Sequence, residues 1–475
     1  MKKNFIYNML YQILILIIPL ITMPYVSRVL GAEGIGVYSY TYSIAYYFMI
    51  IAMLGLNNYG NRTIAKVRDN KEELSKQFCS IYAFQIISSS IMIIIYLAYV
   101  LIFDNQYKTI ALIQTIYVIS SMFDINWFFF GMEKFKLTIT RNTLIKILSL
   151  ILIFTFVKTA NDLWKYAIIL SSSTLVSNVL LFPFLRKYIK VRITRKKDIL
   201  KHVRPNFILF LPVIAVSIYK IMDKIMLGIF SNVTEVGYYE NAEKLIQVPT
   251  AIITALGTVM LPRVSNMLSN KQEEKVKETI GRIMPFIMFL TFPMVFGSIL
   301  ISKDFALLFF GNEFAKSGDL TLLLSITILF FAWGNVIRTQ YLIPKEMDKH
   351  YVISAFIGAM VNFILNCIFI PKYAAVGACI GTIVAEFVVM FYQSFVIRKE
   401  LPIKKYIIIS IPFLIKSLIM FFITYIICEN ICYSKNYKII LQILIAVTTY
   451  LILNIKYIYK NLEIGKLINK LKGAN

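Results

Sequence analysis

The chain contains fourteen apolar runs, each about as long as a membrane-spanning helix, and this pattern limits its fold more than any other feature. A helix that crosses a bilayer needs about 20 predominantly apolar residues. The runs lie at residues 6–27, 36–56, 78–102, 109–130, 142–157, 166–185, 207–229, 239–261, 283–301, 319–343, 351–370, 376–397, 404–427 and 438–457. Charged residues make up 16% of the 475, against about 25% in an ordinary soluble domain. The sequence therefore predicts an all-α integral membrane protein with about 14 transmembrane helices.

Basic residues alternate between the two sides of these runs. The segments that share a side with the N-terminus hold 35 Lys and Arg residues, and the opposite loops hold 9. Cytoplasmic loops carry the excess of basic residues, so the sequence predicts that both termini are cytoplasmic. The net charge of +25 then faces the anionic inner leaflet, and it requires no nucleic-acid partner.

A weak internal repeat divides the runs into two sets. Residues 29–38 read VLGAEGIGVY, and about 200 residues later 226–228 (MLG) and 235–239 (EVGYY) repeat the Leu-Gly ending and the Glu, Gly, Tyr restart. Transporters with parallel repeats commonly bind substrate between their halves. We predict an N-lobe at 1–185, a basic cytoplasmic linker at 186–206, a C-lobe at 207–397, and two additional helices with a cytoplasmic tail at 398–475.

Signatures of catalysis and of bound cofactors are missing from the sequence. The only histidines, His202 and His350, form no H-E-x-x-H site, and there is no G-x-x-x-x-G-K-[ST] phosphate loop. The five cysteines contain no C-x-x-C pair, which argues against a zinc site. We predict a protein that is not an enzyme and has no cofactor or metal, while Na⁺ or H⁺ as a coupling ion stays open.

Ionisable residues within the runs are candidates for function because each costs about 2.5–3.5 kcal/mol to insert at the centre of a membrane helix. The predicted substrate-binding set is Arg28, Lys146, Lys220, Asp223, Lys224, Lys244 and Arg338. Cations outnumber anions in it, so a lumen lined by these residues would select an anion. For any single residue the alternative is structural: an intrahelical Lys–Asp–Lys cluster, or a side chain that snorkels to the interface.

Other polar and aromatic residues have structural interpretations. Trp127 and Trp164 lie near predicted interfaces and are typical of an aromatic belt. Asn362 and Asn366 are four residues apart and suit hydrogen bonding between helices.

Several motifs resemble those of bacterial polysaccharide flippases. Residues 124–135, DINWFFFGMEKF, resemble that family's Trp-Phe-x-x-Gly-x-Glu signature, and 24–31, PYVSRVLG, resemble its opening. Segments 223–228, 237–239 and 261–263 resemble the start of its second lobe. The pattern from Asn362 to Glu386 is similar to its spans eleven and twelve.

This resemblance implies the multidrug/oligosaccharidyl-lipid/polysaccharide exporter superfamily, in which two pseudo-symmetric six-helix lobes surround a central cavity. It implies a flippase of the bacterial cytoplasmic membrane that moves undecaprenyl-pyrophosphate-linked oligosaccharide repeat units from the inner to the outer leaflet by alternating access. The expected partners are that substrate, membrane lipids, a polysaccharide polymerase and glycosyltransferases. Only Arg28 carries over from the family's cavity cations; the other basic candidates rest on charge alone.

Three alternatives stay open at this point. A multidrug or cation antiporter of the same superfamily would depend on acidic residues such as Asp124. A lipid II flippase would be needed for viability even in cells without surface polysaccharide. A polysaccharide polymerase or ligase would be expected to have a large outer loop.

Overall fold

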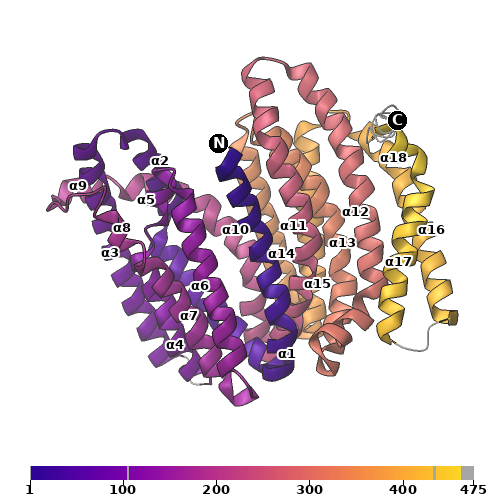
Figure 1. Cartoon of the computed structure of the whole chain (residues 1–475), viewed down its shortest axis with the longest axis horizontal. Coiled ribbons are helices and arrows are strands. Elements are labelled where there is room, and N and C mark those ends of the chain that lie inside the picture. The colour runs from indigo at the N-terminus through magenta and orange to yellow at the C-terminus, as the bar shows by residue number, and fades with distance from the viewer. Residues whose placement is uncertain (1, 104–105, 432–434, 462–475) are drawn as a thin grey trace, which may run out of the picture. The chain divides into compact units, whose positions relative to one another are not determined.

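The computed structural model describes residues 2–103, 106–431 and 435–461 (Figure 1). Within these ranges every regular element is a helix. Twelve helical stretches among the described residues are long and apolar enough to cross a membrane. The first of these, Ile18–Val67, contains the predicted run 36–56 and part of the run 6–27, and a shorter apolar helix covers Tyr437–Leu453. The all-α membrane fold is confirmed.

The chain forms two compact units, of which the first contains the residues through Glu240 together with Asn366–Ala375. Within it α1 packs against α3, α4, α6 and α10, and α4 packs against α7. Its helices are α1 (Lys2–Met53), α2 (Leu56–Val67), α3 (Lys71–Ile102), α4 (Lys108–Ser120), α5 (Asn126–Gly131), α6 (Phe135–Phe156), α7 (Leu163–Val179), α8 (Phe182–Leu185), α9 (Lys196–Leu200), α10 (Val203–Phe230) and the first part of α11 (Val233–Ser269).

The second unit contains Asn241–Leu365 and Val376–Asn475. Here α12 packs against α13, α16 and α17, and the Tyr450 hydroxyl donates a hydrogen bond to the Phe289 carbonyl at 2.8 Å. Its helices are the rest of α11, α12 (Glu273–Phe310), α13 (Ala315–Ile337), the π-helical η4 (Arg338–Leu342), most of α14 (Asp348–Tyr373), α15 (Ala375–Ile397), α16 (Ile403–Ile431), α17 (Lys435–Leu453) and α18 (Ile455–Asn461). Of the predicted cytoplasmic tail, residues 462–475 lie outside the described residues, and the predicted lobe boundaries remain a prediction.

Helix α1 joins the first two predicted spans through a break at Gly31. The backbone of Gly31 has φ 68° and ψ 179°, a conformation that glycine adopts without a side-chain clash. The predicted loop at 28–35 is therefore helical apart from this residue, and the glycine sets the change of direction between the two spans.

Helices extend well beyond the apolar runs on the side predicted to be cytoplasmic. Instead of loops at 57–77 and 262–282, the chain forms α2 before a short turn into α3, and α11 and α12 are separated only by residues 270–272. Lys and Glu are good helix formers in water, so a helix need not end where its apolar run ends. The Asn70 side chain caps α3 by accepting hydrogen bonds from the backbone of Glu72 and Glu73.

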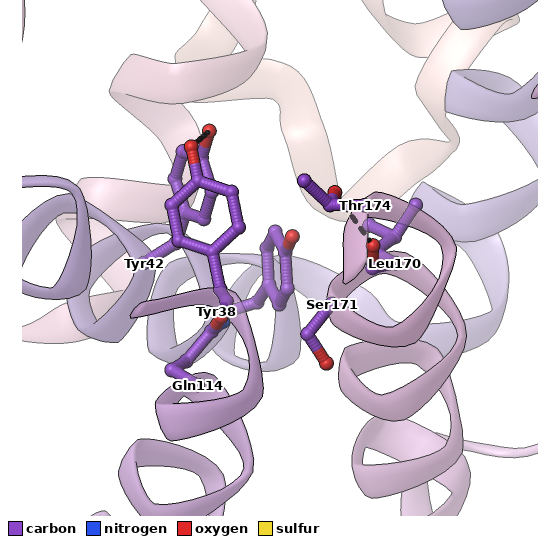
Figure 2. Close-up of a pocket in the computed structure, with 7 residues that line it drawn as sticks. Tyr38, Tyr42, Gln114, Leu170, Ser171 and Thr174 are labelled. Carbon is purple, nitrogen blue, oxygen red and sulfur yellow. Dashed lines mark hydrogen bonds between the residues drawn. The ribbon is translucent and has the colours of Figure 1, made fainter. Parts of the chain in front are cut away.

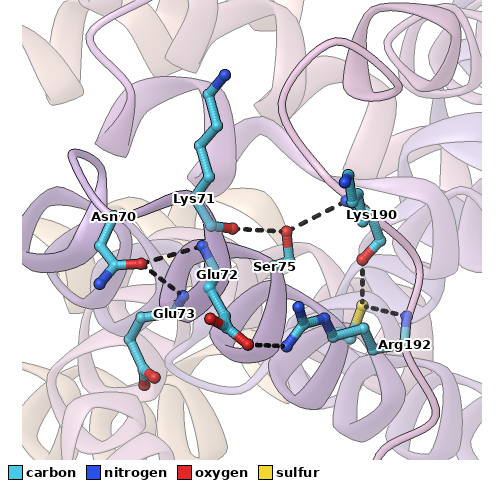
Figure 3. Close-up of polar contacts among 8 residues, drawn as sticks. Asn70, Lys71, Glu72, Glu73, Ser75, Lys190 and Arg192 are labelled. Carbon is cyan, nitrogen blue, oxygen red and sulfur yellow. Dashed lines mark hydrogen bonds and ion pairs between the residues drawn. The ribbon is translucent and has the colours of Figure 1, made fainter.

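The predicted linker is attached to the start of α3 (Figure 3). The Lys190 backbone N–H donates to Ser75 Oγ at 3.2 Å, and the Arg192 backbone N–H donates to Cys79 Sγ at 3.4 Å. Arg192 also forms an ion pair with Glu72 at 2.9 Å. These contacts hold this part of the linker against α3.

The Trp-Phe segment belongs to one of the apolar clusters of the first unit. Trp127, Phe128 and Phe129 are completely buried, and Trp127 Nε1 donates to Gln85 Oε1 at 2.9 Å. A Cβ atom on Gly60 would come within 2.5 Å of the Trp127 ring, so the glycine makes room for it. The prediction of Trp127 as an interfacial belt residue is wrong, because its indole N–H is satisfied inside the protein. Trp164 is exposed, as a belt residue should be.

Candidate functional site

The two copies of the repeated turn pack directly against each other. A Cβ atom on Gly36 would lie 1.7 Å from the Val233 carbonyl oxygen, and one on Gly237 would lie 2.0 Å from the Ala32 carbonyl oxygen. Only residues without a side chain permit this approach of α1 to the start of α11. The repeated glycines therefore fix the position of the residues that follow them in both helices.

Asp223 of α10 is held by two hydrogen-bond donors. Its side chain is buried, Tyr239 Oη donates to Oδ2 at 2.6 Å, and Asn366 Nδ2 donates to Oδ1 at 2.6 Å. A carboxylate removed from water needs such hydrogen bonds to stay charged. The predicted role of Asn366 in hydrogen bonding between helices is seen here between α14 and α10.

Lys224, on the next residue of α10, forms an ion pair with Glu240 of α11. The Nζ to Oε2 distance is 2.6 Å, and the side chains are only 13% and 12% exposed. Lys220, one turn earlier on α10, is exposed. We define the charged network as Asp223, Lys224, Tyr239, Glu240 and Asn366. The spacing of Lys220, Asp223 and Lys224 predicts one shared helical face, but the structure brings only Asp223 and Lys224 into this network.

The other predicted residues of the first unit, Arg28 and Lys146, lie on different helices. Arg28 is exposed on α1, three residues before the break at Gly31, and Lys146 is half-buried on α6.

Lys244 and Arg338 belong to the second unit. Lys244 is half-buried on α11, and Arg338 begins the π-helical segment η4. Arg338 Nη2 donates to Asn335 Oδ1 at 2.7 Å, and its guanidinium lies 5.7 Å from the Tyr351 ring centre. Short π-helical segments often mark functional sites, and this one turns Arg338 toward polar and aromatic partners.

A cavity of about 180 Å³ opens among α1, α4 and α7 of the first unit (Figure 2). Tyr42 and Tyr117 share a hydrogen bond of 3.0 Å between their hydroxyls, and the Tyr38 ring stacks on Tyr42 at 5.7 Å. The lining residues are Tyr38, Tyr42, Gln114, Tyr117, Leu170, Ser171 and Thr174. Ile225, the residue after Lys224, packs in the same apolar cluster as Tyr42 and Tyr117, so the cavity and the network are neighbours.

Sequence reasoning missed this cavity. The tyrosines at 38, 42 and 46 recur every four residues, which places them on one face of a helix. That spacing could have indicated an aromatic stripe, but not the helices that close a cavity over it.

Arg141 was also missed, because it lies at the end of a predicted cytoplasmic loop. It is only 8% exposed, and its Nη2 donates to Asn126 Oδ1 at 2.9 Å. Asn126 Nδ2 in turn donates to Asp124 Oδ1 at 2.6 Å. This network ties the start of α6 to the Trp-Phe segment.

The fold and these sites define a multi-pass, all-helical membrane protein. A solved structure described as the lipid II flippase MurJ in an inward closed conformation is similar over 97% of this chain and 99% of its own, with a TM-score of 0.76 and 19% identity. An inward-facing multidrug resistance MATE family transporter of the MOP superfamily aligns over 81% of this chain and 98% of its own, with a TM-score of 0.57 and 16% identity. At these identities the likeness establishes the fold.

Sequence comparison gives the family. The chain matches the polysaccharide biosynthesis protein family over residues 1–268, more than half of its length, and it belongs to that family. A putative O-antigen transporter of Shigella dysenteriae is 23% identical over 83% of this chain and 99% of its own length. The capsular polysaccharide biosynthesis protein CapF of Staphylococcus aureus is 23% identical over 82% of this chain and 97% of its own.

Proposed function

We propose that the protein is a flippase that moves undecaprenyl-pyrophosphate-linked oligosaccharide repeat units from the inner to the outer leaflet of the bacterial cytoplasmic membrane for surface polysaccharide biosynthesis. The observation that carries the proposal is the family match over residues 1–268. Relatives described as O-antigen transporters and a capsular polysaccharide protein support it, because they align over nearly their full length.

The chemistry of the cargo explains why basic residues lie at membrane depth. A pyrophosphate cannot enter hydrocarbon without partners, because burial of an unpaired charge costs many kcal/mol. Lys220 and Arg28 are exposed on membrane helices and are the first candidates to replace its water. Asp223 and Lys224 are already held within the charged network, so in this proposal they position the helix. Lys146, Lys244 and Arg338 are further candidates for cargo contact.

Alternating access of two six-helix lobes would expose these cations to one leaflet and then to the other. An inside-negative membrane potential favours outward movement of an anion by about 2.3 kcal/mol per charge per 100 mV. With both termini cytoplasmic, the cargo would arrive from glycosyltransferases and leave toward a polymerase. Na⁺ or H⁺ coupling would add to this driving force.

The test is deletion of the gene in its host followed by complementation. We expect the deletion to remove surface polysaccharide and to leave the lipid-linked precursor in the inner leaflet. Wild-type protein should restore the polymer, whereas Lys220→Gln and Arg28→Gln should restore much less. Lys372→Gln makes the same change at an exposed residue near the end of α14 and should behave as wild type.

Two outcomes would contradict the proposal. Death of cells that make no surface glycan would indicate a lipid II flippase. Loss of drug resistance with normal surface polysaccharide would indicate an antiporter.

A further inference from the structure

The cavity among α1, α4 and α7 has walls without charge. None of the seven residues described as lining it is ionised at neutral pH. Five of them carry a hydroxyl group and Gln114 carries an amide; the hydroxyls belong to Tyr38, Tyr42, Tyr117, Ser171 and Thr174. A pyrophosphate would find no cation in these walls, and an organic cation would find no carboxylate. The walls therefore fit a neutral polar group.

The hydrogen-bonding capacity of the walls is mixed. Ser171 Oγ donates to the Ala167 carbonyl at 2.6 Å and Thr174 Oγ1 donates to the Leu170 carbonyl at 3.1 Å, which leaves their oxygen lone pairs to accept. The Gln114 side chain is 1% exposed, and its amide nitrogen, beside Tyr38, makes no well-formed hydrogen bond among the described residues. A ligand that both accepts from this nitrogen and donates to the hydroxyl oxygens would satisfy both kinds of group.

Hydroxyl groups are the neutral groups that donate and accept at the same position. A sugar ring carries several of them around its edge, and its faces present C–H groups that can pack on an aromatic ring. Tyr38 and Tyr42 stack with ring centres 5.7 Å apart and supply such aromatic surfaces beside the hydroxyl groups (Figure 2).

The cavity is large enough for a ring-sized group. Its volume of about 180 Å³ is more than ten times the roughly 10–15 Å³ that one buried water needs in the same measure. One sugar ring could therefore enter it.

We propose that this cavity is a subsite for one sugar ring of the lipid-linked oligosaccharide, separate from the cations that would hold the pyrophosphate. This inference rests on the proposed flippase function. It assigns recognition of the glycan to Tyr38, Tyr42, Gln114 and Ser171 in the first unit. In this proposal neutral residues determine which sugar the protein accepts.

The experiment measures binding of simple glycosides to the full chain in lipid nanodiscs. Methyl glycosides of glucose, galactose, rhamnose and N-acetylglucosamine are added at millimolar concentration, and saturation transfer from protein aromatic protons is recorded by NMR. We expect transfer to at least one glycoside. Ser171→Phe should abolish it by filling the cavity, while Ser172→Phe, which adds the same ring one residue later on α7 and outside the lining, should retain it.

A second variant covers failure of Ser171→Phe to fold. Gln114→Leu keeps the volume and removes the amide donor, so affinity for the glycoside should fall about fivefold to tenfold. Thermal melting of each variant shows whether it is folded.

Two results would overturn the subsite. One is the absence of saturation transfer for all four glycosides, and the other is unchanged transfer in a folded Ser171→Phe or Gln114→Leu protein. If wild-type protein still restores surface polysaccharide in the deletion strain, the flippase function stands without the subsite. If it does not, the flippase function fails, and the assignment of the cavity to an oligosaccharide fails with it.

Discussion

The two copies of the repeated turn share a close glycine contact and differ in the chemistry of the residues that follow it. In the first copy, Tyr38 follows Gly36 by two residues, and it lines a neutral cavity. In the second copy, Tyr239 follows Gly237 by two residues and donates to a buried carboxylate, and the next residue is Glu240 in an ion pair. The glycines keep the helices together, so the residues directly after them are free to diverge in function.

This comparison separates positions that determine the fold from positions that determine recognition. If it is right, damage to the glycine contact should affect both copies. Substitution of the side chains after Gly237 should affect charge compensation, and substitution of those after Gly36 should affect sugar binding.

The largest effect is expected from breaking the shared frame. Gly36→Ala places a methyl group against the rigid Val233 carbonyl, which the backbone can relieve only by moving apart. We expect destabilisation of about 3 kcal/mol or more and loss of transport. Melting in detergent and polysaccharide complementation measure the two effects. Gly297→Ala is the control, because a Cβ there meets nothing within 4 Å, and a normal Gly36→Ala protein would show that the contact is not required.

The next largest effect is expected at the second copy of the repeated turn, which holds the ion pair and which we call the charged copy. Glu240→Gln leaves Lys224 mostly buried without its carboxylate, and removal of one partner of such a pair costs about 3 kcal/mol. The melting temperature should fall. The double variant Lys224→Met with Glu240→Gln removes both charges and should recover most of the loss, whereas equal melting of the single variant and the wild type would contradict the proposed compensation.

A smaller difference separates the two copies at their tyrosines. Tyr239→Phe removes a donor to the Asp223 carboxylate and should cost about 2 kcal/mol, because hydrogen bonds to charged groups are the stronger ones. Tyr42→Phe removes a bond between two neutral hydroxyls and should cost about 1 kcal/mol. Melting curves of the two variants, recorded in parallel, show which substitution costs more stability. A larger loss of stability for Tyr42→Phe would reverse the assignment of the charged and neutral copies.

The smallest effect is expected from an ion pair closer to water, which serves as a reference. In the second unit Lys345 Nζ lies 2.6 Å from Glu400 Oε2, and Tyr341 donates to the same oxygen. The hydrogen bonds from Lys345 and Tyr341 lower the pKa of the Glu400 carboxyl below its ordinary value. Glu400→Gln should therefore cost less than about 1 kcal/mol, as partly exposed pairs do.

The pH dependence of this reference pair follows from the direction of the shift. Because the folded-state pKa of Glu400 is lowered, its contribution is present above the unfolded value of about 4.3 and is lost as pH falls through the folded value. The difference in melting temperature between the wild type and Glu400→Gln should therefore shrink as the pH falls below the unfolded-state pKa of about 4.3. A difference that grows on acidification would contradict the ion pair.

The sequence was sufficient for the membrane fold, because apolar runs of this length have few other solutions in a bilayer. It also located the repeated glycines, although their mutual contact required the structure. Periodicity assigns a residue to a face of its own helix but does not identify the neighbouring helix. For this reason the interfacial position predicted for Trp127 is wrong, and Arg141 is buried although it lies at the end of a predicted loop. The sequence also does not predict the cavity that three helices form.

The most direct test of the central claim is reconstitution of the purified full chain in proteoliposomes that carry an undecaprenyl-pyrophosphate-linked oligosaccharide. A membrane-impermeant enzyme that modifies the glycan reports how much of it reaches the outer leaflet. Our account predicts transfer by the wild-type protein, slower transfer by Lys220→Gln and Arg28→Gln, and normal transfer by Lys372→Gln. Transfer no faster than in protein-free vesicles, with export of an organic cation by the same preparation, would contradict it.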